Sequence, residues 1–140
     1  MDYSDLEKYD SQKMYKIYDN WPEMAESAYN SQIESIDHKD IDHIVFSGMG
    51  GSGTLGDIFQ SILSKTNIHV SVVKGYHLPK TVDNNTLVVT TSVSGNTDET
   101  LEVLNLAKKK DSKIIAFASG GKMEKYCKNN NINFQKITQI

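Results

Sequence analysis

Short apolar runs rich in β-branched residues alternate with stretches of helical spacing from Ile41 onward. The apolar runs lie, in chain order, at 44–46, 70–73, 87–90, 114–117 and, more weakly, 132–134. Apolar residues recur at helical spacing between these runs, in 54–64, 98–110 and 122–130. The first, third and fourth runs are almost continuously apolar, as expected for parallel strands covered by helices on both faces. The pattern predicts the α/β class, as a three-layer αβα sandwich around a parallel five-stranded sheet.

The connection between the second and third runs, residues 75–85, contains Pro79 and has no helical periodicity. We therefore expect it to be a loop that crosses the sheet edge. If the second strand lies on one side of the first and the third strand on the other, the strand order is the flavodoxin-like 2-1-3-4-5. A switch point then lies between strands one and three, and ligands of such sheets bind beside it, at the carboxyl ends of the strands.

The first forty residues differ from the rest because they are rich in Tyr, Asp, Glu and Ser. We expect residues 1–40 to form a helical arm packed onto the main domain, residues 41–140, within a single domain overall. Asp19 or Asn20 could cap a helix that has Trp21 and Pro22 in its first turn. Trp21 is expected to pack as an anchor, since buried aromatic side chains are far commoner than ligand-stacking ones.

The composition excludes several classes of function. A net charge of -3 argues against a nucleic-acid partner, and no apolar run is long enough to span a membrane. Without a signal-peptide pattern, the prediction is a cytoplasmic protein in which Cys127 is a reduced, partly buried residue. All 15 basic residues are lysines, so the bidentate guanidinium grip on phosphate is absent. An anion site would have to use backbone N–H groups, hydroxyls, a helix N-terminus or a lysine.

Two loops combine the residue types that such a site needs. The first run leads into 48–53, where four of six residues are glycine, and a helix follows. Free N–H groups at a helix start attract anions, although a purely structural tight turn is an alternative. The third run leads into 92–97, which supplies three hydroxyls and the amide of Asn96. Capping of the next helix by Thr97 with Thr100 is the alternative there, but it does not call for Ser92 and Ser94.

The segments 48–53, 92–101 and 119–121 together resemble the signatures of the sugar isomerase (SIS) domain. More narrowly, the chain resembles the amino-terminal half of the archaeal-type bifunctional phosphoglucose/phosphomannose isomerases, including the Asn20-Trp21-Pro22 segment and the stretch 75–79. The resemblance implies that the phosphate of a hexose 6-phosphate is bound by residues of the first two segments. They are Gly50, Gly51, Ser52, Ser92, Ser94 and Thr97, and Asn96 completes the predicted site. Val93 departs from the family pattern, where an aromatic residue is common.

The resemblance also implies what this chain lacks. The glutamate and histidine that act on the sugar belong to a second SIS domain, so no catalytic residue is predicted here. The expected partners are a hexose 6-phosphate and a second SIS domain or a homodimer partner, with no nucleic acid or membrane. The alternative is a free-standing, non-enzymatic SIS domain that senses a sugar phosphate. The chain alone is expected to bind a hexose 6-phosphate weakly and to be inactive.

Other candidate residues are weaker. The four histidines are scattered and no metal is expected, although the loop that carries His77 could overhang the site. Asp57, Asp98 and Glu99 are the carboxylates nearest the two loops, but at a helix start they point beside the phosphate. A nucleotide site needs an acidic residue after the second strand. None stands in 74–76, so no cofactor is predicted.

Overall fold

The computed structural model describes residues 8–31 and 36–137. The chain divides into two compact units, Met1–Ser35 and Ile36–Ile140. In the first unit, α2 (Met14–Asp19) is followed by α3 (Trp21–Asn30), and Pro22 lies in the first turn of α3 as predicted. Asn20 precedes α3 without a side-chain capping bond. Trp21 is 55% exposed and lies edge-on to Tyr18, with ring centroids 4.9 Å apart.

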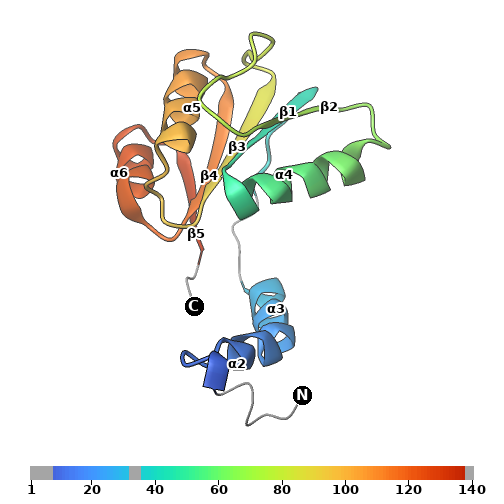
Figure 1. The fold of residues 1–140 in the computed structure, drawn as a ribbon. Coiled ribbons are helices and arrows are strands. Elements are labelled where there is room, and N and C mark those ends of the chain that lie inside the picture. The colour runs from blue at the N-terminus through green and yellow to red at the C-terminus, as the bar shows by residue number, and fades with distance from the viewer. Residues whose placement is uncertain (1–7, 32–35, 138–140) are drawn as a thin grey trace. The chain divides into compact units, whose positions relative to one another are not determined.

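The second unit has a five-stranded parallel sheet with the order β2-β1-β3-β4-β5 (Figure 1). Its strands are β1 (His43–Ser47), β2 (His69–Val73), β3 (Thr86–Ser92), β4 (Lys113–Ala118) and β5 (Asn133–Lys136). Its helices are α4 (Gly50–Leu63), α5 (Asp98–Lys109) and α6 (Gly121–Asn129). The register aligns Ser47 of β1 with Val73 of β2 and Thr90 of β3, so β1 and β2 end together and β3 extends two residues further, to Ser92. The predicted fold class and strand order are confirmed, and the connection from β2 to β3 is a loop.

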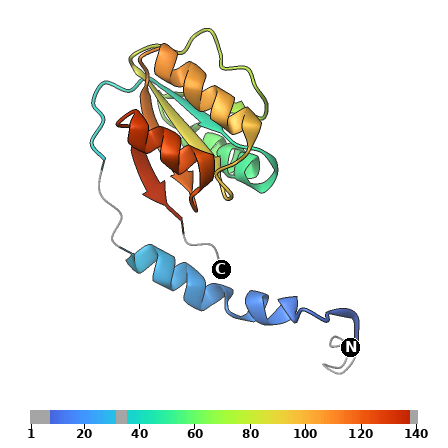
Figure 2. The same cartoon turned by 90° about the vertical axis from the view of Figure 1, so that its left-hand side faces the viewer.

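The hydrophobic core lies between the sheet and the helices α5 and α6. Strand residues alternate in burial, and Val45, Val88 and Ala116 are fully buried on this face. They pack with residues such as Leu104 of α5 and Met123 of α6 in one apolar cluster. Figure 2 shows α5 and α6 in front of the sheet and α4 behind it. The predicted three-layer arrangement therefore has two helices on one face and one on the other.

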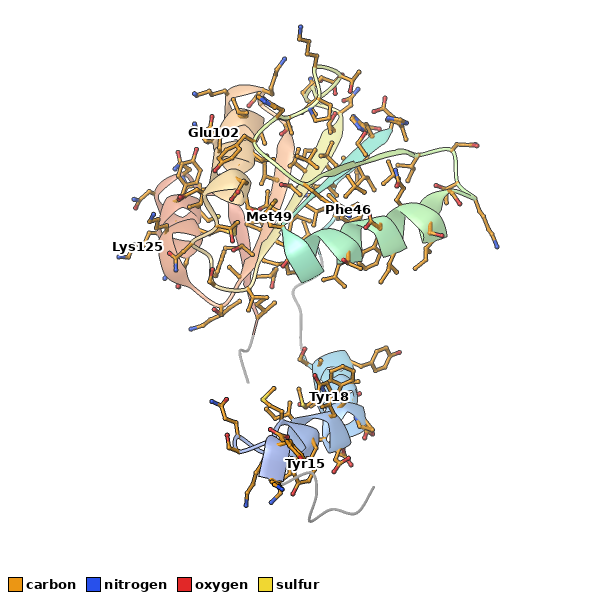
Figure 3. All side chains as sticks on the ribbon, viewed as in Figure 1. Tyr15, Tyr18, Phe46, Met49, Glu102 and Lys125 are labelled. Carbon is orange, nitrogen blue, oxygen red and sulfur yellow. The ribbon has the colours of Figure 1, made fainter. Side chains whose placement is uncertain are left out.

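Helix α4 lies close against β1 and β2 because glycines form its contact surface. Gly53 and Gly56 are its buried residues. A Cβ atom added at Gly56 would meet Phe46 Cβ at 2.9 Å and Val72 Cγ1 at 3.0 Å, so a larger residue would push the helix away. Phe46 lies next to this helix in Figure 3 and stacks on Phe59, with ring centroids 5.3 Å apart.

The boundaries of the predicted elements hold within a few residues except at the start of α4. The sequence pattern placed that start at Thr54, whereas the helix begins at Gly50. Gly50 has φ +52°, which glycine adopts without steric cost, and the N–H of Ser52 already donates to the carbonyl of Met49 at 3.1 Å. The glycines that the sequence pattern assigned to a loop therefore form the first turn of the helix.

No helix among residues 8–31 and 36–137 is long and apolar enough to cross a membrane.

Candidate functional site

A groove of about 710 Å³ opens at the carboxyl ends of the central strands. Both predicted loops reach it: Gly51 and Ser52 line it from the start of α4, and Ser94 and Thr97 line it from the loop between β3 and α5. The other three predicted site residues, Gly50, Ser92 and Asn96, neighbour these positions in the chain but are not part of its lining. The two loops therefore meet on one groove at the predicted switch point of the sheet.

The first turn of α4 presents polar groups to the groove. Gly48 closes the turn before the helix, because a Cβ atom there would lie 2.8 Å from the backbone carbon of Ser52. The Ser52 side chain is partly exposed, and nothing within the described residues forms a hydrogen bond with its hydroxyl. No side chain caps α4 at Met49. The N–H groups of Ser52 and Gly53 donate to the carbonyl of Met49. The N–H groups of Gly50 and Gly51 and the Ser52 hydroxyl are thus the ones available to a ligand.

The second loop is held by hydroxyl groups. Ser92 is buried, and its Oγ lies 2.9 Å from Oγ1 of Thr97 and accepts a bond from the N–H of Gly95 at 3.1 Å. Thr97 precedes α5 but forms no side-chain cap, so the capping alternative for Thr97 is wrong. Its hydroxyl is directed toward Ser92 across the loop instead. The exposed Ser94 accepts a bond from the N–H of Asn96 at 3.2 Å.

The connection from β4 to α6, residues 119–122, packs against the second loop. The Oδ1 of Asn96 accepts a bond from the N–H of Lys122 at 3.0 Å, and its Nδ2 donates to the carbonyl of Ser94 at 3.1 Å. Gly95 has φ +67°, and a Cβ atom there would overlap the carbonyl oxygen of Gly120. Asn96 and Gly120 therefore fix the shape of the second loop, while the groove itself is lined by their neighbours.

The carboxylates near the two loops have partners of their own. Asp57 pairs with Lys74 at 2.5 Å, and Asp98 lies 3.5 Å from the ammonium of Lys122. The negative charge of Glu99 is the main cause that raises the pKa of the Tyr76 hydroxyl. None of these carboxylates lines the groove, and neither does the exposed His77. The groove lining contains no titratable side chain.

Much of the groove is apolar, which the sequence reasoning missed. Leu55 and Phe59 of α4 form one wall, and Val89 and Phe117 of the sheet form the floor. The spacing of the apolar residues in α4 could have indicated an amphipathic face. It could not indicate that this face borders the ligand loops.

A separate polar cluster joins the amino ends of β1, β2 and β3, at the end of the sheet opposite the groove. His43 is 5% exposed, and its Nε2 lies 3.0 Å from the hydroxyl of Ser71. The Thr86 hydroxyl donates to Asp83 at 3.1 Å, so it accepts from Nδ1 of His43 at 3.4 Å. Nε2 then accepts a hydrogen bond from the Ser71 hydroxyl, so both ring nitrogens of a neutral His43 have hydrogen-bond partners. Burial, and next the charge of His69, lower the pKa of His43.

Cys127 is fully buried, and its burial raises the pKa of the thiol to about 11. The cysteine is free, as predicted, and it is more deeply buried than the partly buried position that the sequence analysis expected. Within the described segments, no three His, Cys, Asp or Glu side chains gather closely enough to hold a metal ion.

The fold is that of a doubly wound α/β domain with a groove at the switch point of its parallel sheet. The family model of the SIS domain matches residues 39–138. The chain belongs to the SIS domain family.

Relatives with a described function place the chain near one branch of this family. It is 40% identical over 118 residues to a bifunctional phosphoglucose/phosphomannose isomerase of Caldicellulosiruptor bescii, a match that covers 81% of this chain and 34% of the relative. A bifunctional phosphoglucose/phosphomannose isomerase of Thermoplasma acidophilum is 44% identical over 81 residues, which covers 58% of this chain and 26% of the relative. The chain thus spans about a third of the length of these relatives.

A solved structure supports the fold independently. A candidate phosphosugar isomerase from Bacillus subtilis superimposes with a TM-score of 0.60 at 23% identity. The superposition covers 72% of this chain and 32% of the other. At this identity the likeness concerns the fold alone.

Proposed function

We propose that this domain binds the phosphate of a hexose 6-phosphate, as the amino-terminal SIS domain of a cytoplasmic bifunctional phosphoglucose/phosphomannose isomerase. The observation that carries the proposal is the convergence of Gly51, Ser52, Ser94 and Thr97 on one groove. Two hydroxyl-bearing loops and two helix starts face a common space there. Membership of the SIS family and the similarity to isomerases of this kind support the choice of ligand.

The electrostatics of the groove suit a phosphate ester. Such a group carries a charge of about -1.5 to -2 near neutral pH. Helices α4 and α5 both start at the groove without a side-chain cap, and a helix N-terminus acts as roughly half a positive charge. Neutral hydroxyl donors add hydrogen bonds. The chain contains no arginine, so these backbone groups take the place of a guanidinium.

The residues that line the groove also indicate which step of an isomerisation this domain cannot perform by itself. Isomerisation between an aldose and a ketose needs a base that moves a proton between C1 and C2, within hydrogen-bond reach of that proton. The lining offers no carboxylate and no imidazole. We infer that this domain fixes the phosphate and thereby orients the sugar, while a second SIS domain or a homodimer partner supplies the base. Orientation through a non-reacting group is itself part of catalysis.

Calorimetric titration tests the proposal. Glucose 6-phosphate, mannose 6-phosphate and fructose 6-phosphate are each compared with their unphosphorylated sugars. Ser52→Ala removes a groove hydroxyl that forms no hydrogen bond within the described residues, so the fold should be unchanged. We expect affinity to fall about tenfold or more, the value of one bond to a charged group. Ser61→Ala, at an exposed position of the same helix, is the matched control.

Saturable binding of the phosphorylated sugars alone, weakened by Ser52→Ala and not by Ser61→Ala, would support the proposal. Equal binding of phosphorylated and free sugars would contradict it. So would an unchanged affinity in the Ser52→Ala variant, provided that its circular dichroism spectrum matches that of the wild type.

A further inference from the structure

Two histidine side chains meet at the amino ends of β1 and β2, at the end of the sheet opposite the groove. The register places His43, the first residue of β1, directly beside His69, the first residue of β2. The centroids of their rings are 4.8 Å apart. Nε2 of His43 lies 3.0 Å from the hydroxyl oxygen of Ser71, and Nε2 of His69 lies 3.3 Å from the same atom. Both imidazoles therefore direct the same ring nitrogen to one point in space.

The hydrogen bonds of His43 orient the lone pair of its Nε2 toward this point. Nδ1 of His43 donates to the hydroxyl of Thr86 at 3.4 Å, and that hydroxyl donates to Asp83 at 3.1 Å. A carboxylate thus acts through a hydroxyl on Nδ1, which keeps the proton there and the lone pair on Nε2. Metal-binding histidines are usually held in this way by their other ring nitrogen. His43 is 5% exposed, so its ring has little space in which to turn away.

The charges around the two rings favour a cation between them. Burial, followed by the charge of His69, lowers the pKa of His43, whereas the negative charges of Asp42 and Asp83 act in the opposite direction. His43 is therefore in the neutral form that a metal ion requires of an imidazole. A positive ion beside its Nε2 would also be attracted by both carboxylates.

We propose that His43 and His69 bind a divalent transition-metal ion such as Zn²⁺, Ni²⁺ or Cu²⁺ through both Nε2 atoms, with the Ser71 hydroxyl beside them as a third donor. Imidazole nitrogen suits these ions, whereas Mg²⁺ and Ca²⁺ prefer oxygen ligands. On binding, the proton on Nε2 of His69 moves to its Nδ1, so neither ring gains a charge. Water fills the remaining positions, because no third His, Cys, Asp or Glu in the described part of the chain joins the two histidines. The inference does not depend on phosphate binding in the groove.

Calorimetric titration of the chain with Zn²⁺, without an affinity tag, tests the site. His69→Gln removes one ligand at an exposed position, so the fold should be unchanged. His77→Gln removes another exposed histidine, beyond the carboxyl end of β2, and is the matched control. Thr86→Val keeps the shape of the side chain but removes the hydroxyl that holds Nδ1 of His43. Circular dichroism confirms the folding of each variant.

We expect the wild type and His77→Gln to bind Zn²⁺ with the same affinity. Thr86→Val should weaken binding roughly 10- to 100-fold, the usual cost of losing such a hydrogen-bond partner, and His69→Gln at least as much. The electron paramagnetic resonance spectrum of the Cu²⁺ complex should show coupling to two imidazole nitrogens in the wild type and to one in His69→Gln. Absence of saturable Zn²⁺ binding to the wild type overturns the proposal. Equal Zn²⁺ affinity of the wild type and His69→Gln, or coupling to a single nitrogen in the wild type, overturns it as well.

Discussion

The substitution Gly51→Ala separates the needs of the fold from the needs of a bound phosphate. Gly51 lies in the first turn of α4 and lines the groove. A Cβ atom added there meets no atom within 4 Å, and no positive φ is required at this position. The methyl group is therefore accommodated by the protein alone. If a phosphate rests on the N–H groups of this turn, however, the methyl group occupies the space that the ligand approaches.

The two effects have opposite signs. Alanine loses less backbone entropy than glycine on entering a helix, so the variant should be more stable by about 0.5 kcal/mol. Loss of one hydrogen bond to a charged group costs about 1.5–3 kcal/mol, which corresponds to an affinity roughly 10 to 100 times lower. Urea unfolding measures the first effect, and calorimetric titration with glucose 6-phosphate measures the second.

Gly53→Ala is the matched comparison two residues further along α4. A Cβ atom at Gly53 would lie 2.7 Å from the carbonyl oxygen of Gly48 and 3.1 Å from the Cγ and Cε atoms of Lys74. This variant should lose stability, because the backbone of the preceding turn has to move. If Gly51→Ala binds glucose 6-phosphate as tightly as the wild type does, the phosphate does not rest on the first turn of α4. A Gly51→Ala variant less stable than the wild type would contradict the conclusion that the space around Gly51 is empty.

Two further predictions concern stability. Gly95→Ala should cost more than about 2 kcal/mol of unfolding free energy, because φ is +67° and the new Cβ would overlap the carbonyl of Gly120. Gly75→Ala, whose new Cβ meets no atom within 4 Å, is the control and should change the unfolding free energy by less than about 0.5 kcal/mol. Equal urea midpoints for the two variants would contradict the packing of Gly95 against Gly120. The contribution of His43 to stability should be constant above the ordinary histidine pKa of about 6.5 and fall as the pH drops below it. The unfolded chain then takes up a proton that His43, with its lowered pKa, accepts only at lower pH. His43→Gln should flatten this acid limb, and an unchanged pH profile of the variant would rule out the buried neutral ring.

The strand order could be predicted because each strand carries its own signal. The runs that became β1, β3 and β4 are continuously apolar, as strands buried on both faces must be. The segment from β2 to β3 contains Pro79 and lacks helical spacing, which predicted a loop, whereas the order 2-1-3 rested on the assumption that β2 and β3 lie on opposite sides of β1. These features are local in the sequence, so a single chain reveals them.

The details of the site depend on contacts that the sequence does not show. Gly-rich segments favour loops in isolation, yet Gly50 to Gly53 are helical because the turn at Gly48 starts the helix directly after Met49. Thr97 has the residue type and position of a helix cap. Its hydroxyl pairs with Ser92 instead, because the loop folds back on the end of β3. The partners of His43 lie 28 and 43 residues away in the chain, beyond the reach of any spacing rule.

The glycines of α4 explain both the position of its first turn and the exposure of its apolar side chains. A helix whose inward residues are Gly53 and Gly56 can approach β1 and β2 closely, and this approach brings its first turn to the carboxyl end of β1, where a phosphate can reach the N–H groups. The same choice leaves no inward position for large apolar side chains. They collect on the flank, where Ile58 and Ile62 are exposed. If the start of α4 holds a phosphate as proposed, the close approach that permits this binding also leaves the helix with an exposed apolar side.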